Sequence, residues 1–197
     1  MRAFKPVVAS TLSLALSIGS VAAVVAQDEA KAPDPYLAGT LVGTLGPDFE
    51  DPLGCGPILL PDGTEIPPVT MSGMTTGLTT LLGETTMTSM NCYAPGDVMA
   101  NIPEGAFTLA GEDGDEISGT WSGDCAPSFV SEPTETYLCH GLLSITGGTG
   151  SLEGVSGQIA MMSEHWYAGA DEDGADNPMP TGVRLEGLIE YPAASAE

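Results

Sequence analysis

Glycine and proline interrupt this chain so often that long helices cannot form between them. The sequence holds 26 glycines and 16 prolines among 197 residues. After Pro35, the longest stretches that lack both are Glu84–Ala94 and Gln158–Ala168, and each is barely one average helix long. The first stretch is a mixture of Thr and Met, and Thr favours strands. The chain is therefore predicted to be all-β.

Alternation of apolar and polar residues with a period of two places the strands. The clearest strand is Leu37–Leu45, in which every second residue shares one face. An Asp113-Gly114 pair between two alternating runs predicts a hairpin. About eight strands at this spacing suit either a sandwich or a closed barrel. The remaining strands are predicted over Val69–Thr75, Glu84–Asn91, Ala106–Gly111, Glu116–Asp124, Tyr137–Ile145, Val155–Glu164 and Gly182–Tyr191.

The same alternation predicts which side chains face the interior. On the last two strands the predicted inward residues are Val155, Gly157, Ile159, Met161, Val183, Leu185, Ile189 and Tyr191, with Arg184, Glu186 and Glu190 outside. An interior of this kind binds apolar molecules or fills itself. The residues predicted to line a ligand site there are Phe107, Leu109, Trp121, Ile159, Met161 and Leu185.

The N-terminus has the features of a secretory signal peptide. Arg2 and Lys5 precede an apolar run, Val7–Ala26, and small residues at its end predict cleavage after Ala26. The alternative is a retained membrane anchor, because 20 residues can just span a bilayer. Five hydroxyl residues weaken such a span, and no cysteine follows that could carry a lipid. We therefore expect a secreted or periplasmic protein with residues 1–26 removed, a leader over 27–36, one barrel domain over 37–192 and a tail over 193–197.

The charge is strongly acidic. The full chain has a net charge of −23, and removal of residues 1–26 leaves Lys31 and Arg184 against 27 carboxylates, a net charge of −25. Nucleic acid is excluded as a partner because phosphate contacts need a basic surface, and anionic membranes are disfavoured for the same reason. The mature form is expected not to be embedded in a membrane. Since like charges repel at low salt, external salt should stabilise the fold, as in a marine or halophilic habitat.

Four cysteines lie in the exported part of the chain. An even number in an oxidising compartment predicts two disulfides. Cys125 ends one predicted strand and Cys139 lies early in the next, so this pair can reach bridging distance, and Cys55 then pairs with Cys92. A zinc site is the weaker alternative, because no two cysteines have the spacing of a zinc motif.

A glycine-rich segment, Ile145–Gly154, has the composition of a phosphate-binding turn. Such a turn must open a helix, yet Gly154 and Gly157 interrupt the following residues, which alternate as a strand. Only about 40 residues remain after it, too few for a large dinucleotide-binding unit. We therefore predict no nucleotide cofactor.

Instead, these residues carry a family resemblance. The hairpin strand Phe107–Gly123, the strand Tyr137–Ile145 and the turn Thr146–Gly157 together resemble exported bacterial members of the allene oxide cyclase barrel-like family. Dirigent proteins are more distant relatives with a similar Gly-Gly-Thr-Gly turn. Leu152 stands where Phe is usual and Val155 where Ala is usual. The resemblance covers about residues 106–162 and implies a single eight-stranded antiparallel β-barrel.

The resemblance implies no activity, because the matched residues are turn glycines and packing anchors. The polar residues that serve catalysis in the plant cyclases lie outside the matched motifs. No serine-hydrolase or zinc-protease motif is present.

Two acidic segments are candidate sites. Asp113, Asp115 and Glu116 could form a carboxylate cluster for acid–base chemistry or calcium, although a solvated hairpin tip explains them as well. The better calcium candidate is a second segment that departs from the EF-hand pattern. Its candidate ligands are Asp171, Asp173 and Asp176.

The two histidines are candidates for acid–base chemistry, since histidine titrates near neutrality. His140 shares its strand face with Leu138, Leu142 and Ser144, which also suits a packed or surface residue. His165 precedes Trp166 and Tyr167 near a strand end, an arrangement that suggests an aromatic-lined mouth.

The sequence thus predicts an exported, disulfide-bonded barrel that acts as a binding or structural module, with a small apolar ligand inside it. The alternative is an enzyme of the cyclase or isomerase type, in which the barrel orients a hydrophobic substrate. Self-association into a homo-oligomer is compatible with both.

Overall fold

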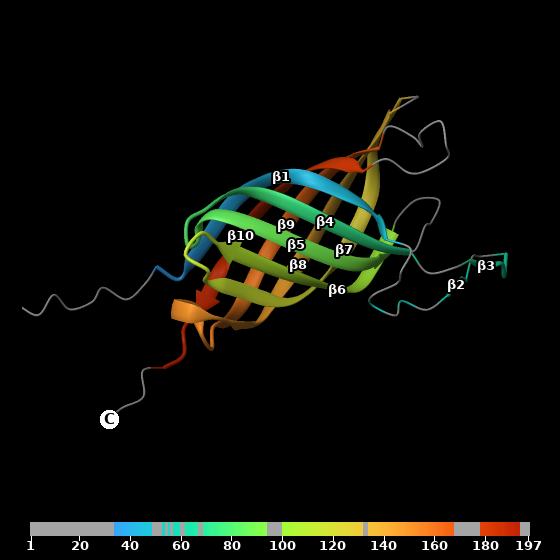
Figure 1. Ribbon diagram of the computed structural model, residues 1–197. Coiled ribbons are helices and arrows are strands. Elements are labelled where there is room, and N and C mark those ends of the chain that lie inside the picture. The colour runs from blue at the N-terminus through green and yellow to red at the C-terminus, as the bar shows by residue number, and fades with distance from the viewer. Residues whose placement is uncertain are drawn as a thin grey trace, which may run out of the picture. The chain divides into compact units, whose positions relative to one another are not determined.

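A computed structural model describes residues 34–48, 53, 55, 57–59, 62–66, 69–93, 100–131, 134–167 and 178–193. Eight antiparallel strands close into a barrel in the order β1-β10-β9-β8-β7-β6-β5-β4 (Figure 1). The predicted all-β, eight-stranded antiparallel barrel is confirmed. The strands are β1 (Tyr36–Asp48), β4 (Val69–Thr79), β5 (Gly83–Tyr93), β6 (Ala100–Gly111), β7 (Glu116–Ser131), β8 (Thr134–Gly148), β9 (Ser156–Tyr167) and β10 (Met179–Glu190).

Two short strands, β2 (Ile58–Leu59) and β3 (Glu65–Ile66), form a separate antiparallel pair that the alternation did not predict. A single 3₁₀ turn, η1 (Gly150–Leu152), joins β8 to β9. In the part of the chain that the structure describes, no helix is long and apolar enough to cross a membrane. The predicted signal peptide, leader start and tail end lie outside the described residues.

The predicted register of β9 and β10 is confirmed, because their buried side chains are the odd-numbered ones. Ile159 pairs with Leu143 on β8 and Gly187 on β10 and is fully buried, whereas its neighbour Gln158 is exposed. Tyr191 lies just beyond β10, partly buried against the core. One core runs along the barrel, built from Leu37, Leu41, Met87, Phe107, Leu109, Ile117, Trp121, Leu143, Ile145, Leu152, Val155, Ile159, Met161, Val183, Leu185 and Ile189 with both cysteines of one disulfide.

All eight barrel strands are longer than predicted, and β6 and β7 continue through prolines that the sequence pattern places outside them. β6 begins before Pro103, and its register shifts between Ile102 and Gly105. β7 continues past Pro127, where a second register shift occurs. Proline within sheets is confined to edges and bulges, where the missing N–H breaks no ladder. The bulges therefore allow both strands to continue.

Between β1 and β4, glycines stand where the neighbouring backbone leaves no room for a side chain. A side chain at Gly43 would collide with the backbone of Met74 and Thr75, and one at Gly77 with the backbone of Thr40 and Leu41. These glycines are therefore required by the spacing of the strands.

The glycine-rich turn is held by the hairpin that precedes β7. Thr149 N–H donates to the carbonyl oxygen of Glu116 at 2.9 Å, and Glu116 N–H donates to Thr149 Oγ1 at 3.1 Å. Asp115 accepts hydrogen bonds from both the backbone N–H and the hydroxyl of Ser151. Gly150 lies against the same carboxylate with φ of +62°, which favours glycine. The hairpin and the glycine-rich turn thus contact each other.

Both predicted disulfides are present. Cys125 and Cys139 are paired residues of β7 and β8, they face the interior, and their Cα atoms lie 4.0 Å apart. Cys55 is bonded to Cys92 on β5, with 5.4 Å between the Cα atoms.

Candidate functional site inside the barrel

Buried polar side chains gather inside the barrel at the end where β5 and β9 finish and β4 and β10 begin. Ser163 and His165 come from β9, Thr181 from β10, Thr75 from β4 and Asn91 from β5. The pairing aligns Thr75, Gly43, Thr181 and His165 across four neighbouring strands. Since all of these positions are odd-numbered, their side chains face the interior. We call Ser163, His165 and Thr181 the inner polar cluster.

The hydrogen bonds of the inner polar cluster form a chain in which each group donates to the next, from Ser163 to His165 to Thr181. The Thr181 hydroxyl donates to the carbonyl oxygen of Met179 at 3.0 Å, so its oxygen can only accept from His165 Nδ1, 2.9 Å away. This assigns the proton of the neutral imidazole to Nδ1. His165 Nε2 is then an acceptor, and the Ser163 hydroxyl donates to it at 2.9 Å. A serine hydroxyl bonded to an oriented imidazole is the arrangement of an activated nucleophile.

Burial keeps His165 neutral. Desolvation lowers the pKa of the His165 imidazole from 6.5 to about 4. The imidazole has two hydrogen-bonded neighbours, Ser163 and Thr181, and no charge at neutral pH, so the inner polar cluster itself is uncharged. Such a surface suits the polar group of a neutral molecule better than an ion.

Two further interior groups have unmet hydrogen-bonding capacity. Thr75 Oγ1 and Trp121 Nε1 are buried, and neither has a hydrogen-bond partner among the described residues; a third such atom, the Tyr191 hydroxyl oxygen, lies just beyond β10. The indole of Trp121 lies over Gly105, whose missing side chain leaves room for the ring. A buried polar group without a partner costs about 1–3 kcal/mol, so water or a bound molecule is expected to satisfy these atoms.

The residues predicted to line a ligand site all belong to one buried cluster. It contains Phe107, Leu109, Trp121, Ile159, Met161 and Leu185. The structure therefore brings the predicted set together inside the barrel, next to the inner polar cluster. Whether these residues contact a ligand stays a prediction.

The other candidates lie elsewhere. His140 is exposed on the outer face of β8, as a surface histidine. Asp113 and Glu116 are exposed at the hairpin. The Asp115 carboxylate is not simply solvated there, because it accepts a hydrogen bond from the Ser151 backbone N–H. The prediction that aromatic residues beside His165 line a mouth of the barrel is wrong for Trp166. Its side chain lies on the outer face and packs over Gly182. The candidate calcium ligands Asp171, Asp173 and Asp176 lie outside the described residues.

Sequence reasoning missed the inner polar cluster, although a signal was available. The odd-numbered face of Val155–Met161 continues to Ser163 and His165 without a break. The predicted strand ends at Glu164, which places His165 at the strand end rather than on its inner face. Extending the alternation by one residue would have placed Ser163 and His165 together inside.

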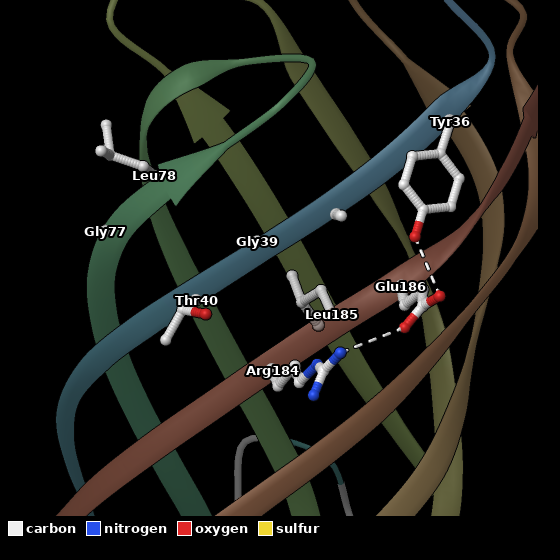
Figure 2. A pocket seen from close by; sticks show the side chains of 9 residues that line it. Tyr36, Gly39, Thr40, Gly77, Leu78, Arg184, Leu185 and Glu186 are labelled. Carbon is white, nitrogen blue, oxygen red and sulfur yellow. Dashed lines mark hydrogen bonds and ion pairs between the residues drawn. The ribbon is translucent and has the colours of Figure 1, made fainter.

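A shallow groove crosses the outside of the barrel over β10, β1 and β4, with a volume of about 730 Å³ (Figure 2). The Tyr36 hydroxyl donates to Glu186 Oε1 at 2.9 Å, and Arg184 Nη2 lies 3.6 Å from Glu186 Oε2. The hydrogen bond to Glu186 raises the pKa of the Tyr36 phenol. Glycines floor the groove, and Leu78 stands at its other side (Figure 2).

The fold and interior define a disulfide-bonded, closed eight-stranded barrel with an apolar core and a polar cluster at one end. No family model matches the chain, and no curated protein matches it. Among solved structures the chain is similar to a pterocarpan synthase dirigent protein, at 14% sequence identity over 82% of this chain and 90% of that chain, with a TM-score of 0.36.

Proposed function

We propose that the barrel is a binding module for a small, mainly apolar molecule, held inside beside the inner polar cluster. The observation that carries this proposal is the pair of buried polar atoms, Thr75 Oγ1 and Trp121 Nε1, that lack partners among the described residues. Ligand sites typically combine apolar walls with a few placed polar groups, and the interior has both. The neutral state of His165 favours an uncharged ligand.

A neutral fluorescent probe tests this proposal. N-phenyl-1-naphthylamine is expected to bind saturably, and Ile159→Phe, which fills the interior, should weaken binding at least tenfold. The matched control is Ala160→Phe, which adds the same ring to the exposed side of β9 and should leave binding unchanged. Equal binding by both variants would reject the interior site.

Because Ile159→Phe could disturb the core, Thr75→Val provides a second variant. It removes the unpartnered hydroxyl at nearly constant volume. Loss of a buried, unbonded hydroxyl should preserve or raise the melting temperature of the free protein, while binding of a hydroxyl-bearing probe such as 1-naphthol should weaken. A lower melting temperature with unchanged binding would show that Thr75 has a structural role instead.

A cyclase or isomerase is the second candidate function, because the inner polar cluster offers a serine hydroxyl bonded to an oriented imidazole. An enzyme of this type would convert a supplied hydrophobic substrate into a product with a new ring or a changed configuration. His165→Gln should stop that conversion while binding of N-phenyl-1-naphthylamine continues. Unchanged conversion in the variant would exclude His165 from the chemistry.

We also propose that the chain is an exported protein related to the allene oxide cyclase barrel-like family. Two disulfides support an oxidising compartment. The contact between Asp115 and Ser151 gives a structural reason for the two parts of the family motif to occur together. Intact-mass measurement of the exported protein tests cleavage after Ala26, and a mass that includes residues 1–26 would support the retained anchor.

A further inference from the structure

Two buried donors without partners lie at a similar depth inside the barrel. The β4–β5, β6–β7 and β8–β9 turns close the same end of the barrel, because neighbouring strands are antiparallel. Thr75 and Phe107 lie four residues before the ends of β4 and β6 at these turns. Trp121 and Met161 lie five residues after the starts of β7 and β9 at the same turns. We call these four buried residues the Trp121 layer.

The Trp121 layer combines apolar walls with hydrogen-bonding groups that have no partner. The side chains of Phe107 and Met161 are only 3% and 4% exposed. Trp121 Nε1 and Thr75 Oγ1 are buried without a hydrogen-bond partner among the described residues. The third such atom, the Tyr191 hydroxyl oxygen, lies beyond the end of β10 and outside this layer. A ligand in the Trp121 layer can therefore make two hydrogen bonds that the described residues do not supply.

A glycine on the neighbouring strand makes room for the Trp121 indole. A Cβ atom at position 105 would lie 2.4 Å from Trp121 Nε1 and 2.6 Å from the carbonyl oxygen of Met90. No larger residue fits there while the indole keeps its position. The place of the indole N–H is thus fixed by Gly105 as well as by the packing of Trp121 itself.

The chemistry of the two donors selects the ligand. An indole N–H can only donate, and a threonine hydroxyl always has a proton to donate. A carbonyl oxygen has two lone pairs and no proton, so it can accept from both groups. A ligand hydroxyl can accept from Trp121 and donate to Thr75, but the Thr75 proton then stays without an acceptor. We propose that the ligand carries a ketone or ester carbonyl, and that Trp121 and Thr75 bind its oxygen. This inference rests on the proposed binding of an apolar molecule inside the barrel.

The charges of the chain favour a neutral carbonyl over a carboxylate. Arg184 is the one Lys or Arg among the described residues, and its side chain is 71% exposed on the outside of the barrel. His165 is neutral at pH 7, because burial lowers the pKa of its imidazole to about 4. A carboxylate in the Trp121 layer would therefore have no cation beside it among the described residues, and an unpaired buried charge is costly.

Displacement of N-phenyl-1-naphthylamine by two compounds of similar shape tests the proposal. The ketone 2-acetylnaphthalene has a carbonyl where the hydrocarbon 2-ethylnaphthalene has a methylene. Trp121→Phe should weaken binding of the ketone about five- to tenfold, as expected for one neutral hydrogen bond, and change binding of the hydrocarbon less than twofold. The matched control is Trp166→Phe, the same substitution on the outer face of β9, which should leave both affinities unchanged.

Infrared difference spectroscopy of the bound ketone gives a measurement that a purely structural role of Trp121 would not change. The carbonyl stretch should lie at lower frequency in the natural protein than in hexane, and Trp121→Phe should shift it back towards the hexane value. If Trp121→Phe fails to fold, Thr75→Val provides the same comparison of ketone and hydrocarbon.

Two results would overturn the carbonyl site and leave the apolar binding module intact. These are an unshifted carbonyl band in the natural protein, and equal weakening of ketone and hydrocarbon by the variant. Failure of both compounds to displace the dye would instead reject the interior binding site, and this inference with it.

Discussion

Acidification should destabilise the barrel through one side chain, His165. Burial lowers the pKa of its imidazole to about 4 from 6.5 in the unfolded chain. The unfolded state therefore binds a proton more readily than the folded state between these values, and stability falls as pH falls below 6.5. From the two pKa values, the loss between pH 7 and pH 5 is about 1.8 kcal/mol. Above pH 6.5 this group makes almost no difference.

Urea unfolding followed by tryptophan fluorescence at pH 7, 6 and 5 measures this loss. Carboxylates also titrate in this range, so the quantity compared is the difference between the natural protein and His165→Gln. That difference should change by about 1.8 kcal/mol, with the natural protein losing more. His140→Gln, which removes an exposed histidine, should show the pH profile of the natural protein. Parallel profiles for the natural protein and His165→Gln would refute the assignment of His165 to a buried, neutral state.

Three further measurements test the register, the charge and the turn. Ile159→Ala should cost about 2–5 kcal/mol as a cavity, and Gln158→Ala less than about 0.5 kcal/mol; reversed costs would place the opposite face inside. The melting temperature should rise between about 0.1 and 1 M NaCl, because the Debye length falls from about 10 to 3 Å, and an equal rise in sucrose would assign the effect to solvent exclusion instead. Asp115→Ala should cost about 1–2 kcal/mol through the lost bonds to Ser151, whereas Asp113→Ala, exposed on the same hairpin, should be nearly neutral; equal costs would contradict the role of Asp115.

The strand pattern could be predicted because the barrel buries one face of every strand. A one-residue shift would expose Ile159 and bury Gln158, so the alternation fixes the register. The disulfide between Cys125 and Cys139 followed from the same alternation, since a hairpin pairs one strand's end with the next strand's start. Closure into a barrel did not follow from periodicity. It came from the family resemblance, because a sandwich has the same alternation.

The inward threonines of the polar interior could not be predicted from alternation alone, because a period of two separates faces but does not say whether an isolated threonine turns inward. Thr75 and Thr181 occupy inward positions that a hydropathy pattern assigns equally well to solvent. Their direction is fixed by pairing partners, with Gly43 between them. Long-range pairing of this kind is set by tertiary structure, and the local sequence around each threonine contains no trace of it.

The acidic composition and the neutral strands have one physical explanation. A charge on the inner face of a barrel strand would be buried at high cost, and a charge at the middle of the outer face repels its neighbours on adjacent strands about 4.8 Å away. Turns separate carboxylates more widely and leave them hydrated. The hairpin of β6 and β7 carries Glu112 at its tip, where repulsion by Glu84 raises the pKa of the Glu112 carboxyl. The cost of like charges is thus visible at a strand end, and it would be higher along β4 and along β1 from Tyr36 to Pro47, which carry no charged residue.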